Sequence, residues 1–141
     1  MNRPQFSFRA WALICIALST LVGCSSRDVA QVSGRVQYKD GTPITGGVRV
    51  IRFEPTGDTT AEIQKAASGT IEEDGTFVLF TRKPGDGVFR GKYGVTFTVL
   101  TKAMGGESLI APEYEHVNST PYVVEVTDDI TDVVYELEKR M

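Results

Sequence analysis

The clearest structural signal in the sequence is the stretch Tyr93-Gly94-Val95-Thr96-Phe97-Thr98-Val99. Large apolar side chains occupy every second position, and glycine or threonine fills the positions between them. Side chains of a β-strand alternate between its two faces, so this spacing predicts a strand with one buried face. We therefore expect a β-sheet whose core includes Tyr93 and Phe97.

Six further stretches are predicted to be strands, and turn residues separate several of them. The pairs Asp40-Gly41 and Asp74-Gly75 are the strongest turn signals, because Asp-Gly favours tight turns. Within 48–53 the apolar spacing shifts, which predicts either a bulge or a strand buried on both faces. The six stretches are residues 31–38, 48–53, 67–71, 76–81, 122–126 and 133–137.

Seven short strands without a long helical pattern predict a single all-β domain, a sandwich or a barrel. The chain has 141 residues, which is the length of one domain. Residues 101–121 form the one long gap between predicted strands. We expect this gap to be a surface excursion or to include one helical turn near Glu113.

The N-terminal residues have a different pattern. Arg3 and Arg9 precede the largely apolar run 10–22, which is typical of a secretory signal peptide. The run is shorter than the roughly 20 residues that a membrane-spanning helix needs. A short membrane anchor or a buried helix is the alternative interpretation.

The stretch Leu21-Val22-Gly23-Cys24 resembles the lipobox of bacterial lipoproteins. In that family a signal peptidase cuts before the cysteine, which then carries lipid, and several acyl chains give stable anchoring. The resemblance implies a signal peptide over 1–23, lipidation of Cys24, a lipidated tether over 24–29 and a β-sandwich domain over 30–141. The alternative is a cysteine that follows an ordinary signal peptide by chance.

Two further inferences depend on the lipobox. Cys15 would leave with the signal peptide and Cys24 would be lipidated, so the mature domain would have neither a free thiol nor a disulfide. Lipoproteins with Asp after the lipidated cysteine tend to stay at the inner membrane. Ser25 occupies that position here, which favours the outer membrane.

The order of the strand and turn segments resembles the carboxypeptidase regulatory-like, or transthyretin-like, β-sandwich domains, in the form of small lipoproteins of planctomycete-type bacteria. This resemblance implies a seven-stranded antiparallel Greek-key sandwich and an envelope location, and it implies no reaction. The segments that carry it include Val32-Ser33-Gly34-Arg35-Val36, Asp40-Gly41-Thr42-Pro43-Ile44, Asp74-Gly75-Thr76-Phe77, Pro84-Gly85-Asp86-Gly87, Gly91-Lys92-Tyr93-Gly94-Val95 and Ile110-Ala111-Pro112-Glu113-Tyr114.

Few residues suggest chemistry. His116 is the only histidine and lies in the long gap, where a solvated side chain is the preferred interpretation over a catalytic base. Asp128, Asp129 and Asp132 could hold a hard cation such as calcium, but a charged turn between two strands is the preferred interpretation. Asp86, between two glycines, could be a ligand, but we expect it to serve its own turn. We therefore predict no catalytic residue, no metal and no cofactor.

The predicted function is that of a lipid-anchored cell-envelope β-sandwich with a structural or protein-interaction role. The lipid on Cys24 is expected to attach the protein to the membrane, and an envelope protein or a glycan is the expected partner of the domain. The net charge of -3 argues against nucleic acid. The alternative is a carbohydrate- or peptide-binding module of the cell surface, for which Tyr114 and Tyr122 are the candidate exposed aromatic contacts. Burial in the core explains these two aromatic residues equally well.

Overall fold

A computed structural model describes residues 28–59 and 61–141. The predicted signal peptide (1–23), Cys24, Ser25 and most of the predicted tether lie outside the described residues. Within them the chain is all-β, with one short 3₁₀ helix, η1 (Pro112–Glu115). No helix of this part of the chain is long and apolar enough to cross a membrane.

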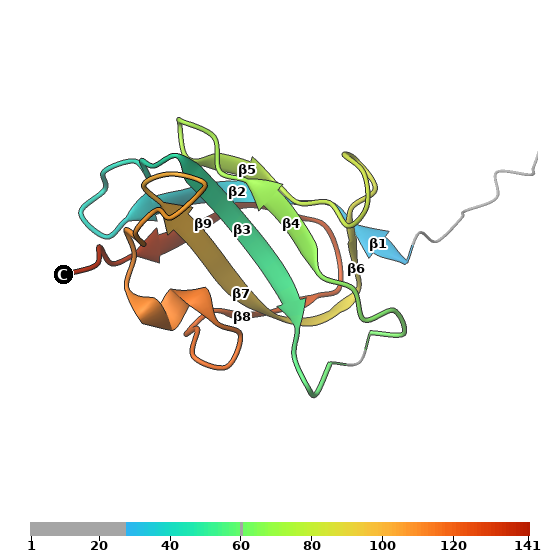
Figure 1. The fold of residues 1–141 in the computed structure, drawn as a ribbon. Coiled ribbons are helices and arrows are strands. Elements are labelled where there is room, and N and C mark those ends of the chain that lie inside the picture. Colours follow the sequence, from blue (N-terminus) through green and yellow to red (C-terminus); the bar gives the residue numbers. More distant parts are fainter. Residues whose placement is uncertain (1–27, 60) are drawn as a thin grey trace, which may run out of the picture.

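The strands form several sheets rather than a barrel (Figure 1). A four-stranded sheet, in the order β4-β3-β7-β8, consists of β3 (Val48–Pro55), β4 (Ala67–Thr70), β7 (Gly91–Leu100) and β8 (Val123–Val126). A three-stranded sheet, in the order β5-β2-β9, consists of β2 (Val32–Tyr38), β5 (Thr76–Val78) and β9 (Ile130–Leu137). A two-stranded sheet consists of β1 (Val29–Ala30) and β6 (Val88–Phe89).

Each of the seven predicted strands has a counterpart, but the prediction of seven strands, all antiparallel, needs two corrections. The described residues also contain the two-residue strands β1 and β6, which are too short to give a periodic signal. In addition, β2 and β9 pair in parallel, whereas every other strand pair is antiparallel. A tight turn imposes antiparallel pairing, and β2 and β9 are not joined by one.

Strand β3 decides between the two interpretations of residues 48–53. It pairs with β7 in one continuous register from Val48 to Pro55, so the predicted bulge is wrong. Ile51 and Phe53 are fully buried, and Val48 and Val50 on the other face are half-buried. Both faces of β3 are therefore at least partly buried, which explains why apolar residues occur on both faces rather than at every second position.

The two larger sheets share one hydrophobic core. Phe97 of β7 and Tyr135 of β9 meet edge to face, with ring centroids 5.7 Å apart, and so connect the two sheets. Tyr93 is fully buried, and its hydroxyl donates a hydrogen bond to the carbonyl oxygen of Phe89 at 2.7 Å. The prediction that Tyr93 and Phe97 belong to the core is confirmed.

The parallel pair depends on a glycine. The register between β2 and β9 shifts between Val32 and Gly34. A Cβ atom at Gly34 would lie 2.1 Å from the carbonyl oxygen of Val133, far inside van der Waals contact. Only a residue without a Cβ therefore fits between the two strands at this position.

The long gap between β7 and β8 is an ordered part of the fold. It contains η1, so the predicted helical turn near Glu113 is confirmed. Bridges pair Ser108 with Leu100 in one sheet and Ile110 with Lys139 beyond β9, so 108–110 links the edges of both sheets. This link closes one side of the core and positions the groove described next.

Candidate functional site

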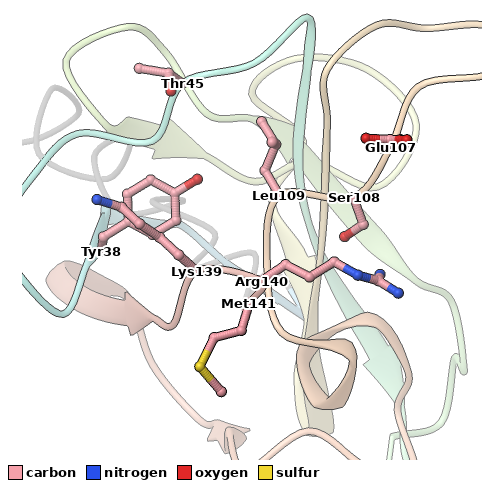
Figure 2. Close-up of a pocket in the computed structure, with 8 residues that line it drawn as sticks. All are labelled: Tyr38, Thr45, Glu107, Ser108, Leu109, Lys139, Arg140 and Met141. Atoms are coloured by element: carbon pink, nitrogen blue, oxygen red, sulfur yellow. The ribbon is translucent and has the colours of Figure 1, made fainter.

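A groove opens where the linking segment 107–109 meets the residues that follow β9 (Figure 2). Its volume is about 780 Å³. The C-terminal end of the chain and β1 lie at opposite ends of the domain, so the groove is remote from β1 (Figure 1). The side chains that line it are Tyr38, Thr45, Glu107, Ser108, Leu109, Lys139, Arg140 and Met141.

Backbone hydrogen bonds hold the floor of the groove in place. The N–H of Ala111 donates to the carbonyl oxygen of Glu138 at 3.0 Å, and the N–H of Arg140 donates to that of Leu109 at 3.1 Å. The residues after β9 thus continue as an extended segment against 109–111. Successive side chains of an extended segment point in opposite directions, which separates Lys139 from Arg140 (Figure 2).

Lys139 is held by two neighbours. Its Nζ lies 2.6 Å from Oδ2 of Asp40 and 4.9 Å from the centroid of the Tyr38 ring. Hydrogen bonds from Lys139 and then from Thr42 hold the pKa of the Asp40 carboxyl well below its usual range. The positive charge of Lys139 is therefore already balanced by Asp40.

Arg140 differs from Lys139 in this respect. None of the ion pairs among the described residues involves its guanidinium group. Thr45 and Ser108 add hydroxyl groups to the lining, and Glu107 adds a carboxylate. The groove thus offers hydrogen-bond donors, acceptors and charges of both signs, which suits the binding of a polar ligand.

The structure does not bring the other candidate residues into a common site. His116 is exposed at the end of η1, where its carbonyl oxygen accepts hydrogen bonds from the N–H groups of Ser119 and Thr120. Asp129 accepts a hydrogen bond from the N–H of Gln31 at 2.8 Å, and Asp128 lies 3.9 Å from Arg90. Among the described residues, no group of three or more possible ligands is placed to hold a metal ion.

Asp86 organises its own loop, as predicted. Its carboxylate accepts hydrogen bonds from the backbone N–H groups of Thr81, Arg82 and Lys83, at 2.8, 2.9 and 3.1 Å. Burial alone would raise the pKa of the Asp86 carboxyl. The three backbone donors outweigh burial, so the net pKa lies below its ordinary value.

Of the two interpretations of Tyr114 and Tyr122, exposed binding contacts or buried core residues, the structure supports burial. Tyr114 is only 2% exposed, and Tyr122 is half-buried against the core. The two rings stack 6.0 Å apart, and both pack against Phe97. The long gap folds back onto the sheet, so its aromatic residue becomes part of the core.

The sequence did not single out the groove residues. The only available signal was the pair Lys139-Arg140 directly after a strand, which marks a cationic strand end without indicating a groove. Comparison of the chain with models of protein families, with curated proteins and with solved structures gave no match.

Proposed function

We propose that this protein is a lipid-anchored cell-envelope protein in which Cys24 holds a non-catalytic β-sandwich domain at the membrane. The observation that carries the proposal is the position of Leu21-Val22-Gly23-Cys24 directly at the end of the apolar run. A basic start, an apolar run and a small residue before a cysteine are together what export followed by lipidation requires.

The finer fold assignment belongs to the same proposal. Two sheets that share one core support a transthyretin-like Greek-key sandwich. The parallel pair β2–β9 departs from a purely antiparallel arrangement, as described above.

The domain geometry agrees with anchoring at one end. The described chain starts at Asp28 beside β1, four residues after Cys24. Four fully extended residues reach about 14 Å, so the β1 end would stay close to the lipid surface. The groove at the opposite end would then face away from the membrane, toward other components of the envelope (Figure 1).

The test is intact mass and membrane fractionation of the full chain expressed in a bacterial host. We expect the wild type to lack residues 1–23, to carry acyl mass and to sediment with membranes. Cys24→Ser should abolish lipidation, and Cys15→Ser, the matched control within the predicted signal peptide, should change nothing. A soluble wild-type protein without acyl groups would refute the proposal.

A separate variant tests whether the protein is located at the inner or the outer membrane. Because Ser25 follows Cys24, we propose an outer-membrane location. Separation of the two membranes by density should place the wild type in the outer fraction and Ser25→Asp in the inner fraction. Equal distribution of both proteins would remove Ser25 as the sorting signal.

A second candidate function is supported by the groove. Among the described residues Arg140 has no ion-pair partner, and the hydroxyls of Thr45 and Ser108 line the same groove. This combination suits a carbohydrate or a peptide with an acidic group. Screening of acidic glycans and peptides against wild type, Arg140→Ala and the exposed control Arg82→Ala tests it. Binding that only Arg140→Ala weakens supports this function, and a failure of all ligands leaves the structural role alone.

A further inference from the structure

The segment that follows β9 is hydrogen-bonded to a neighbour on one side only. Ile110 and Lys139 form an antiparallel bridge, and the two backbone hydrogen bonds that hold the floor of the groove flank it. In an antiparallel pair of this type, the N–H and C=O groups of the two central residues point away from each other. The N–H and C=O groups of Lys139 therefore point away from Ile110, and neither has a backbone partner within the described residues.

A turn after β2 leaves this side of Lys139 open. The N–H of Lys39 still donates to the carbonyl oxygen of Leu137 in β9, at 2.9 Å. The chain then turns, because Gly41 has a φ of 80° and its N–H donates to the carbonyl oxygen of Tyr38 at 2.8 Å. β2 thus ends before it could pair with Lys139, and both Tyr38 and Lys139 line the groove that results.

Two side chains of the groove carry charges that the described part of the chain does not balance. None of the ion pairs there involves the guanidinium group of Arg140 or the carboxylate of Glu107. The charged ends of both lie on one side of Leu109, whereas Lys139, which Asp40 already balances, lies on the other (Figure 2). A ligand that complements this side of the groove therefore needs an acidic group and a basic group together.

A peptide fits these features better than a glycan does. An acidic glycan would leave Glu107 facing a like charge, which is costly at an interface. The lining of the groove offers no open aromatic face for a sugar ring, because Tyr38 is 5% exposed and Nζ of Lys139 lies 4.9 Å from its ring centroid. A peptide supplies both charges, and its backbone supplies the hydrogen-bond partners that the backbone of Lys139 lacks.

We propose that the groove binds an extended peptide segment of another protein, which pairs as a short strand with the backbone of Lys139. An acidic side chain of the peptide faces Arg140, and a basic side chain faces Glu107. Backbone pairing supplies affinity, and the two charges supply specificity. This inference rests on the binding function proposed above for the groove and names its ligand. The groove lies at the end of the domain remote from β1, so a neighbouring envelope protein is the source of the peptide (Figure 1).

The first experiment selects linear heptapeptides from a random library on the full chain in detergent. We expect the wild type to enrich peptides with an acidic and a basic residue at a fixed spacing. Arg140→Glu should replace the acidic residue by a basic one, and Glu107→Lys should replace the basic residue by an acidic one. Arg82→Glu, at an exposed arginine outside the groove, is the matched control and should keep the wild-type consensus. No enrichment on the wild type, or one consensus for all four proteins, overturns the proposal.

The second experiment tests the backbone pairing. Calorimetry measures how tightly the wild type binds one selected peptide and copies of it that are N-methylated at a single amide. Methylation of the amide that donates to the Lys139 carbonyl oxygen removes one hydrogen bond and should weaken binding by about fivefold. Methylation of the two adjacent amides should have little effect, because they point away from Lys139. Equal affinities for all copies would refute the strand pairing.

Acidic oligosaccharides, titrated against wild type and Arg140→Ala in the same detergent, distinguish this inference from the function on which it rests. If they bind through Arg140 and no peptide does, the groove remains a binding site and the peptide inference is refuted. If neither class of ligand binds, the binding function itself fails. Lipidation of Cys24 is read from the intact mass of the same samples, so the anchor is judged independently.

Discussion

The hydroxyl of Tyr122, the residue directly before β8, hydrogen-bonds to the backbone of β9 and so connects the two larger sheets. Tyr122→Phe removes this oxygen and leaves the ring in its stack with Tyr114 and against Phe97. The hydroxyl donates to the carbonyl oxygen of Glu136 at 2.6 Å and accepts from its N–H at 3.2 Å. The substitution therefore deletes two hydrogen bonds to backbone groups of β9.

The magnitude follows from the exposure of these groups. A typical intramolecular hydrogen bond contributes about 0.5–1.5 kcal/mol to stability. Glu136 is exposed, so water replaces part of what Tyr122 supplies. We expect Tyr122→Phe to lower the free energy of unfolding by about 1–2 kcal/mol. For a domain of this size that corresponds to a fall in Tm of about 3–8 °C.

Tyr135→Phe provides the matched control within the same aromatic cluster. Burial raises the pKa of Tyr135 to about 12, and no hydrogen bond found among the described residues involves its hydroxyl. We expect this variant to change stability by less than about 0.5 kcal/mol. Urea unfolding with an unchanged m-value gives both differences. If Tyr122→Phe is no less stable than Tyr135→Phe, the hydroxyl does not stabilise the β8–β9 edge.

Two further predictions concern backbone positions. Gly34→Ala should lower the free energy of unfolding by about 3 kcal/mol or prevent folding, because its Cβ would meet the Val133 carbonyl oxygen. Gly57→Ala is the control, because the space around Gly57 is open. We expect it to be nearly neutral when both variants are unfolded with urea. Asp86 has a folded-state pKa below its unfolded value, so its stabilisation is present above about pH 4 and is lost as pH falls through the folded-state pKa. The Tm difference between wild type and Asp86→Asn should therefore shrink on acidification, and a constant difference would contradict this.

The strands were largely predictable because their signals are local. The alternation of large apolar residues with glycine or threonine predicted β7. The Asp-Gly pairs predicted the turn after β2 and the turn between β4 and β5. The parallel pairing of β2 with β9 was not predictable, since neither strand carries a residue that encodes direction. Gly34 was the only local trace of it, and its role depends on the close approach of Val133, which is a property of the folded chain.

The groove was less accessible to sequence reasoning than the fold. Its lining comes from the end of β2, the loop around Thr45, the segment 107–109 and the residues after β9. Tyr38 and Thr45 are close in sequence, but tens of residues separate them from 107–109 and from the residues after β9, so no short motif unites the lining. For Tyr114 the sequence left exposure and burial equally open, because its burial depends on how the long gap folds against the sheet.

The pairing of β2 with β9 also has a consequence for the order of folding. Gln37 and Glu136, linked by a hydrogen bond of 3.0 Å, are 99 residues apart in sequence. β2 is the central strand of its sheet, so that sheet is incomplete until the last strand of the chain is available. Contacts of such separation slow folding, because a large loop must close before they form. A chain shortened before Ile130 would keep every strand of the four-stranded sheet but lack β9, which contributes Tyr135 and Leu137 to the core.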